Sequence, residues 1–351
     1  MPIPVVVSDA HLAHDGLIEL VRGDPVPCFE SPARAVEIER ALRAAGGYLL
    51  EPPIQHGRAP ITAVHGPDLV DLLEHVWTDA LSDGFDGSRP LIPDTFATAA
   101  FAAGHDPGEI PASRFDRLGR YCFDTATPIV EGTYAAARAA VDVALTAADR
   151  VTSGAAFAYG LCRPPGHHAG KRVFGGYCYF NNAAIVAQAL IDAGAARVAI
   201  LDVDYHHGNG TQQIFWERGD VLYLSLHGDP RAAYPYFSGY ASELGGGAGA
   251  GRNRNFPLAP GTELAGYVAA LREALRLIVD FDPDAPLVLS LGFDTFEHDP
   301  ISDLALRTSD YREIAAIIAQ LGRPVIALQE GGYAVDALGA NAVSFLAGLR
   351  G

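Results

Sequence analysis

The stretch Leu201–Gln212, LDVDYHHGNGTQ, decides how the rest of the chain is interpreted. It continues an apolar run rich in Val, Ile, Leu and Ala, which predicts a buried parallel strand. Because alternate residues of an extended segment point the same way, Asp202, Asp204 and His206 are expected on one face where the strand ends. Ligands bind outside the carboxyl ends of such strands, and buried carboxylates need a compensating cation. The pattern favours a metal site; the alternative is an acidic turn with Asn209 capping the following helix.

Outward from this stretch, predicted strands and helices alternate through the second half of the chain. Strands are predicted at 155–162, 197–203, 221–226, 287–291 and 325–328, and helices at 182–193, 211–218, 263–279, 309–321 and 335–349. The first half contributes a strand at 3–7, an irregular segment at 15–30, and helices near 31–45, 67–78 and 127–150. This order predicts an α/β fold with a mostly parallel central sheet flanked by helices on both faces.

The composition narrows the class of protein. The 351 residues carry a formal net charge of −17, which disfavours nucleic acid and anionic membrane surfaces as partners. The four cysteines form no C-x-x-C pair and are expected to be reduced: Cys28, Cys122, Cys162 and Cys178. Neither a signal-peptide pattern nor an apolar run of transmembrane length is evident, so a cytoplasmic protein without a membrane partner is expected.

Three further stretches follow predicted strands. They read RPPGHHAG at 163–170, LGFDTFEHDP at 291–300 and QEGGY at 329–333. With the first stretch they predict Asp204, His206 and Asp294 as metal ligands, His167 and His168 as acid–base groups, and Tyr333 as a hydrogen-bond donor. Three protein ligands leave one position open, which is typical of a catalytic zinc-type site. Taken singly, the histidines could be core residues, Asp294 a helix cap and Tyr333 a packing aromatic.

Six motifs in order resemble the arginase–deacetylase superfamily. They are RPPGHHAG, GGYCYFNNAA at 175–184, LDVDYHHGNGTQ, SLHGDP at 225–230, DTFEHDP at 294–300 and EGGY at 330–333. Within that superfamily the chain is similar to the bacterial acetylpolyamine amidohydrolases, which are relatives of the zinc-dependent histone deacetylases. The resemblance covers essentially the whole chain and implies a single arginase/deacetylase-like domain over residues 1–351.

The resemblance also implies roles for individual residues. Zn²⁺, or alternatively Fe²⁺, would be held by Asp204, His206 and Asp294. Tyr333 would polarise the substrate carbonyl, and the tandem histidines would have Asp202 and Asn209 as their partners. Because Asn209 is neutral whereas Asp202 is charged, His168 is expected to act as general base and then general acid. A structural monovalent cation, usually K⁺, is implied at Asp202, Asp204, His206, Ser225 and Leu226.

At the substrate end, the resemblance implies a narrow tunnel for an acetylated diamine or polyamine. Gly176, Tyr177 and Tyr234 match its lining, and Glu19 matches a rim carboxylate that would bind the substrate ammonium. Asp124 is a further expected rim acid. Two other acidic rim positions of polyamine-type members fall on Phe115 and Ala126, where Asp116 or Asp124 could substitute. His227 and Cys178 are also expected to line the site.

The segment 81–118 is rich in Gly, Pro, Asp and Ser and long for a loop. It matches an insertion that polyamine-type members use to dimerise and to constrict the entrance, so a homodimer is expected. Three alternatives stay open: an acetyl-lysine amidohydrolase of the histone-deacetylase type, an arginase-type ureohydrolase with two Mn²⁺, and a binding protein without activity. The spacing Asp202-Val203-Asp204-Tyr205-His206 supports one metal rather than two.

Overall fold

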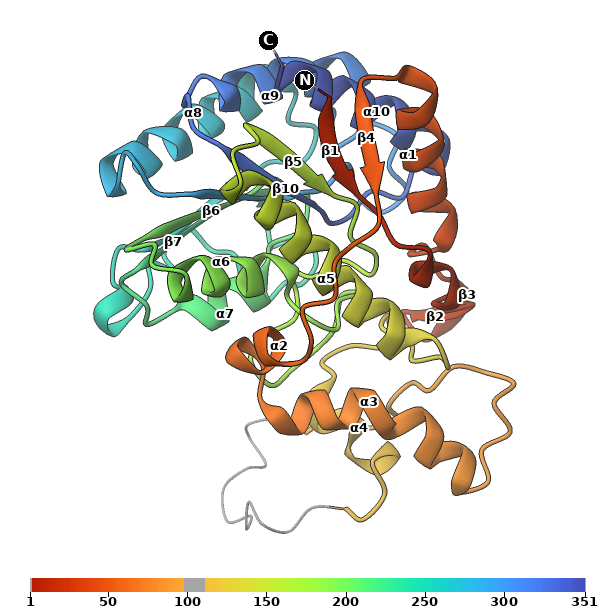
Figure 1. Cartoon of the computed structure of the whole chain (residues 1–351). Coiled ribbons are helices and arrows are strands. Elements are labelled where there is room, and N and C mark those ends of the chain that lie inside the picture. Colours follow the sequence, from red (N-terminus) through yellow and green to blue (C-terminus); the bar gives the residue numbers. More distant parts are fainter. Residues whose placement is uncertain (1, 98–110, 351) are drawn as a thin grey trace.

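Eight strands form one central sheet in the computed structural model, which describes residues 2–97 and 111–350 (Figure 1). The strand order is β4-β1-β5-β10-β9-β6-β7-β8, and every neighbouring pair is parallel. The mostly parallel sheet predicted from the sequence is confirmed. The strands are β1 (Ile3–Val6), β4 (Tyr48–Glu51), β5 (Phe157–Gly160), β6 (Val198–Asp202), β7 (Val221–Gly228), β8 (Asn253–Leu258), β9 (Leu287–Leu291) and β10 (Val325–Gln329).

Helices cover both faces of the sheet, as predicted (Figure 1). Alternate residues of β6 enter two different cores: Ala199 and Leu201 pack with one layer of helices, and Val198 and Ile200 with the other. The first layer contains α1 (Pro32–Ala45), α8 (Leu264–Phe281), α9 (Thr308–Ala319) and α10 (Val335–Gly348). The second contains α2 (Ala59–Val64), α3 (Pro67–Ser82), α4 (Leu118–Tyr121), α5 (Thr133–Thr152), α6 (Asn182–Asp192) and α7 (Asn209–Phe215).

The strand order places four of the motifs side by side. β5, β10, β9 and β6 are consecutive in the sheet, and all four run in the same direction. Their carboxyl ends therefore meet at one edge, and the loops that leave them carry the RPPGHHAG, QEGGY, LGFDTFEHDP and LDVDYHH sequences. β6, β9 and β10 are buried along their whole length because both of their faces are covered.

The segment 15–30, predicted as irregular, contains an antiparallel hairpin of β2 (Ile18–Val21) and β3 (Asp24–Pro27). Pro25 and Pro27 argued against a strand, yet a two-stranded ribbon tolerates proline because one side of each strand needs no partner. The edge strands β4 and β8 were also not predicted, and β8 reads NRNFPL, without a clear apolar pattern. The helix predicted at 127–150 begins at Thr133.

The segment 81–118 is only partly described, because residues 98–110 lie outside the described ranges. α3 continues to Ser82, and the segment ends in a 3-10 turn, Phe115–Arg117, that leads into α4. Its expected roles in dimerisation and in narrowing the entrance stay predictions, as does the single domain over residues 1–351. In the ranges 2–97 and 111–350, no helix combines the length and apolar character that crossing a membrane requires.

Candidate active site

Asp204, His206 and Asp294 lie together at the carboxyl edge of the sheet. Each offers one ligand atom, and the three atoms lie within 4.8 Å of one another. His206 Nδ1 is 3.0 Å from Asp294 Oδ2 and 3.4 Å from Asp204 Oδ1. Both carboxylates are fully buried, and among the described residues neither forms an ion pair with an arginine or lysine. The sequence prediction that these three residues converge is thus matched by their placement.

Backbone amides orient the two carboxylates. Asp204 accepts hydrogen bonds from the N–H groups of His206 (2.8 Å) and Gly331 (2.7 Å), and Asp294 accepts one from Tyr205 (2.8 Å). A side chain at Gly331 would not fit, because its Cβ would lie 2.3 Å from Asp294 Oδ2. Burial, followed by the charge of Asp204, raises the pKa of Asp294 to about 7. Two repelling buried carboxylates beside an imidazole are a donor set that fits one divalent cation.

The tandem histidines lie beside this cluster, each with its own partner. His167 Nδ1 is 3.0 Å from Asp202 Oδ2, and His168 Nδ1 is 2.6 Å from Asn209 Oδ1. Burial lowers the pKa of His167, but the charges of Asp204 and Asp202 outweigh it and raise that pKa to about 10. For His168, burial and the neighbouring His167 hold the pKa well below its usual range. The pKa values of the two imidazoles are therefore shifted in opposite directions.

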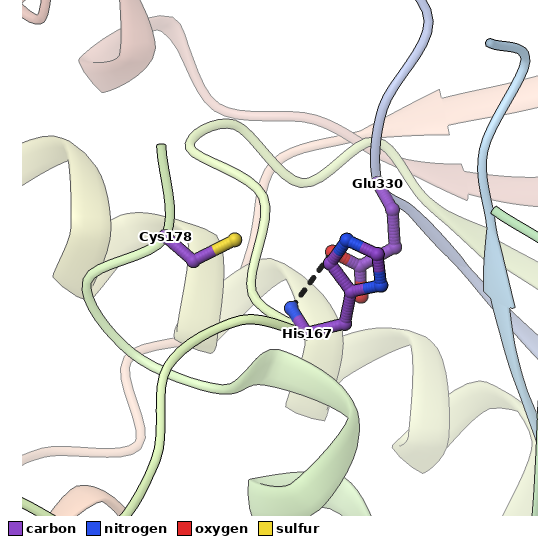
Figure 2. A group of neighbouring side chains, drawn as sticks. All are labelled: His167, Cys178 and Glu330. Carbon is purple, nitrogen blue, oxygen red and sulfur yellow. Dashed lines mark hydrogen bonds between the residues drawn. The ribbon is translucent and has the colours of Figure 1, made fainter. Parts of the chain in front are cut away.

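A second buried group consists of His167, Cys178 and Glu330 (Figure 2). Glu330 Oε2 accepts the backbone N–H groups of Gly166 (2.6 Å) and His167 (3.1 Å), and the latter bond is the dashed line in Figure 2. The Cys178 thiol points toward the pair, and burial raises its pKa well above the usual range. We interpret this group as the anchor of the histidine loop.

Tyr333 is held by two residues that the sequence analysis did not assign. Asp299 Oδ2 accepts the backbone N–H groups of Tyr333 (2.6 Å) and Ala334 (3.2 Å). The Arg34 guanidinium lies 4.7 Å from the centre of the Tyr333 ring and donates to the carbonyl of Gly332 (2.5 Å). Asp299 falls inside the DTFEHDP motif, so a signal was present, whereas Arg34 is 298 residues away from Gly332 and gave none.

A channel with a volume of about 390 Å³ leads to these residues. His168, His206 and Tyr333 are among its lining residues, and we call the part of the channel next to them its inner end. Tyr177 and Tyr234, predicted as tunnel residues, both line it, and their rings lie 5.6 Å from Tyr333 and 5.1 Å from His168 respectively. Gly176 also lines the channel, and a Cβ there would lie 2.2 Å from His168 Cδ2, so a larger residue would displace the imidazole.

The two expected rim acids both line this channel, but they differ in burial and in hydrogen bonding. Glu19, on β2, is buried; its Oε1 accepts a hydrogen bond from Tyr177 Oη at 3.1 Å, and its Oε2 has no partner among the described residues. Burial raises the pKa of Glu19 to about 7, although the hydrogen bond from Tyr177 lowers it. Asp124 is partly exposed, and both of its oxygens already accept hydrogen bonds.

The remaining predicted residues fall at varying distances from the channel. Ala126 lines it, whereas Phe115 and Asp116 line a separate cavity of about 750 Å³. His227 is buried and hydrogen-bonded to Ser225 Oγ (2.7 Å) and to the Gly239 carbonyl (2.9 Å). Contrary to expectation, neither His227 nor Cys178 lines the channel. For the expected monovalent cation, the structure pairs Asp202 on β6 with Ser225 on β7, and Leu226 follows directly. Asp202 is the last residue of β6, whereas Ser225 and Leu226 lie within β7 beside it.

Several known proteins are similar to the chain along nearly its whole length. The model of the histone deacetylase domain matches residues 28–349. The chain is 47% identical over 346 residues to acetylpolyamine amidohydrolase 1 of Pseudomonas aeruginosa, with 99% of this chain and 98% of that protein covered. It is 43% identical to the acetylpolyamine amidohydrolase of Mycoplana ramosa, with 99% of each covered. A crystal structure of acetylpolyamine aminohydrolase from Burkholderia pseudomallei superposes with a TM-score of 0.92 at 39% identity, covering 99% of this chain and 98% of that one.

Proposed function

The chain belongs to the histone deacetylase family and is a hydrolytic deacetylase, and from this premise we propose that it acts on small acetylated diamines and polyamines. N-acetylputrescine, N-acetylcadaverine and N-acetylspermidine are the proposed substrates, and the products are acetate and the free amine. The observation that carries the proposal is the channel itself, which has residues of the metal-ligand cluster at one end and, along its wall, the buried carboxylate of Glu19, whose Oε2 has no partner among the described residues. A slender cation with a distal amide fits both features.

We propose Asp204, His206 and Asp294 as the ligands of one Zn²⁺ ion, with Fe²⁺ as the alternative metal. Bound there, the ion would supply Lewis acidity, which lowers the pKa of a water molecule and polarises the acetamide carbonyl. K⁺ is proposed beside the end of β6, held by Asp202, Asp204, His206, Ser225 and Leu226, the last two of which lie within β7. There it would stabilise the segment after β6, which carries two of the zinc ligands.

His168 is proposed to carry the proton. Its Nδ1 faces the amide oxygen of Asn209, an acceptor, so Nδ1 bears the hydrogen and Nε2 is left with a lone pair. The neutral imidazole takes a proton from the attacking water at Nε2 and then gives it to the amine nitrogen as the C–N bond breaks. His167, cationic beside Asp202, stays protonated and donates a hydrogen bond to the oxygen of the attacking water.

Tyr333 is proposed to stabilise the carbonyl oxygen as it gains negative charge. Burial raises the pKa of Tyr333 well above its usual range, so the hydroxyl keeps its proton and acts as a donor. Asp299 and Arg34 hold the turn that presents it. The oxygen is thus bound from the side of the tyrosine while the water lies on the side of the histidines.

Substrate turnover tests the proposal directly. The zinc-reconstituted protein is assayed with N-acetylputrescine, N-acetylcadaverine, N-acetylspermidine and an acetyl-lysine peptide. We expect a higher kcat/KM for the acetylated diamines and polyamines than for the peptide. A higher kcat/KM for the peptide would assign the acetyl-lysine alternative. Hydrolysis of arginine with two Mn²⁺ per chain would assign the ureohydrolase alternative.

The oligomeric state is a separate part of the proposal. We propose a homodimer in which the segment 81–118 narrows the entrance, so that a folded protein bearing acetyl-lysine is rejected. Light scattering gives the mass in solution, and deletion within that segment is expected to yield a monomer that accepts acetylated histone tails. A wild-type monomer that prefers those tails would contradict both ideas.

A further inference from the structure

One carboxylate touches both aromatic walls of the channel. Asp124 Oδ2 accepts a hydrogen bond from the hydroxyl of Tyr234 (2.6 Å) and another from the backbone N–H of Gly176 (2.7 Å), the residue before Tyr177. Tyr234 belongs to the loop that follows β7 and Tyr177 to the loop before α6, so the walls come from segments far apart in the sequence. Within the described residues of the channel, they meet at this single oxygen atom.

The other oxygen of Asp124 secures the Tyr177 wall further. Asp124 Oδ1 accepts hydrogen bonds from Thr127 Oγ1 (2.9 Å) and from the backbone N–H of Ala126 (3.2 Å). Thr127 Oγ1 in turn accepts the backbone N–H of Tyr177 at 3.0 Å. This support matters because Tyr177 has a φ of 65°, in the left-handed region that is unfavourable for a non-glycine residue. A strained wall residue needs contacts that determine its position.

Four donors occupy the two oxygens of Asp124, which distinguishes it from Glu19. Glu19 has one oxygen without a partner among the described residues and can bind a cationic substrate. Asp124 has no oxygen left over for that purpose unless a wall contact breaks. Its geometry is that of a structural brace across the channel rather than of an ammonium acceptor.

We propose that Asp124 is a specificity-determining residue that fixes the separation of the Tyr177 and Tyr234 walls and thereby restricts the channel to unbranched alkyl amides. The proposal rests on the proposed deacetylation of small linear amines, whose methylene chain would pass between the two rings. The carboxylate acts by positioning and touches no reacting atom. Loosening either wall widens the channel and admits bulkier chains without changing the chemistry at its inner end.

Three variants separate the brace from the walls it holds. Asp124→Asn keeps the shape of the side chain but has one acceptor oxygen instead of two, so two of the four donors lose their partner. Tyr234→Phe keeps the ring and removes only its bond to Asp124. Tyr177→Phe is the matched control, because it also removes a wall hydroxyl, yet that hydroxyl bonds to Glu19 and the backbone contacts to Asp124 and Thr127 stay.

The readout is the ratio of kcat/KM for N-acetylcadaverine to that for mono-acetylated p-xylylenediamine, which carries the same ammonium on an aromatic spacer. We expect Tyr234→Phe and Asp124→Asn to lower this ratio by about tenfold, the scale at which a pocket discriminates by size. Tyr177→Phe should leave it within about twofold. An unchanged ratio in Tyr234→Phe, or an equal drop in Tyr177→Phe, would overturn the proposal. Tyr234→Phe decides the matter if Asp124→Asn does not fold.

A second substrate pair keeps this test apart from the proposed function. If the wild-type protein leaves N-acetylcadaverine intact, the proposed substrate class is wrong. The ratio is then measured on peptides that carry either acetyl-lysine or 4-(acetamidomethyl)phenylalanine, the corresponding linear and aromatic side chains. The same variants are expected to lower that ratio, and an unchanged value would again reject the role of Asp124.

Discussion

The inner end of the channel and its mouth are built in different ways. At the inner end, the metal-ligand cluster, the tandem histidines and Tyr333 follow four adjacent parallel strands, and buried hydrogen bonds connect them. We call the part of the channel that is lined by Glu19, Asp124 and Tyr234 its mouth. Glu19 comes from a small hairpin outside the main sheet, and Asp124 and Tyr234 are partly exposed residues of loops. The difference teaches that the sheet positions the groups proposed for the chemistry, while a hairpin and loops outside the sheet position those proposed for substrate selection.

Metal removal is expected to have the largest effect, because it acts on the inner end alone. Dialysis against a chelator should abolish turnover of every substrate, and added Zn²⁺ should restore it. Asp204→Asn should also be inactive but should not recover with zinc, since the cluster then lacks one charged ligand. Metal content by mass spectrometry checks both results. Full activity in metal-free protein would show that the chemistry at the inner end does not need a metal ion.

Replacing each of the tandem histidines by alanine tests their roles at the inner end. His168→Ala should lower kcat by about 10²–10⁴-fold, the usual contribution of a general acid–base group. His167→Ala should cost less, because in our proposal that residue keeps its proton throughout. Steady-state kinetics with one acetylated diamine provides both values. Near-normal turnover in His168→Ala together with loss of turnover in His167→Ala would reverse the assignment.

Asp299→Asn tests whether the inner end depends on its hydrogen-bonded frame. Asp299 accepts the N–H groups of Tyr333 and Ala334 with Oδ2 and that of Ile301 with Oδ1, whereas the amide has one acceptor oxygen, so the contacts on one side are lost and the turn loosens. We expect kcat to fall by about tenfold with little change in KM, as for a small displacement of a catalytic group. Tyr333→Phe provides the control: in that background, Asp299→Asn should add almost nothing to the loss. Additive losses would mean that Asp299 acts independently of Tyr333.

Glu19→Gln should have an effect of about the same size as Asp299→Asn, but on substrate binding at the mouth and for cationic substrates alone. KM for N-acetylputrescine should rise by about tenfold, whereas N-acetylbutylamine, which has no ammonium, should be unaffected. Because the pKa of Glu19 is raised to about 7, the carboxyl gains a proton as the pH falls below 7 and loses its attraction for a cation. The wild-type KM for N-acetylputrescine should therefore rise toward acidic pH, and the variant should lack this dependence. An equal change for both substrates would place Glu19 outside ammonium binding.

The same division explains how much could be predicted from the sequence. The parallel sheet and the convergence of Asp204, His206 and Asp294 were predictable because each ligand directly follows a buried apolar strand. The hairpin that carries Glu19 was missed, since the prolines of β3 obscure a strand pattern. Its bond to Tyr177 spans 158 residues and leaves no local trace. Asp124 was predicted as a rim acid, but its four hydrogen bonds depend on loop packing that no motif records.

The Glu330 carboxylate has a consequence for the motions of the protein. It receives the amide hydrogens of Gly166 and His167, so the loop that carries the histidines is tied to the end of β10. These two amides can exchange with deuterated water only when that bond opens, and the strand beneath it is buried in the middle of the sheet. The amide hydrogens of Gly166 and His167 should consequently exchange with deuterium more slowly than those of exposed surface loops.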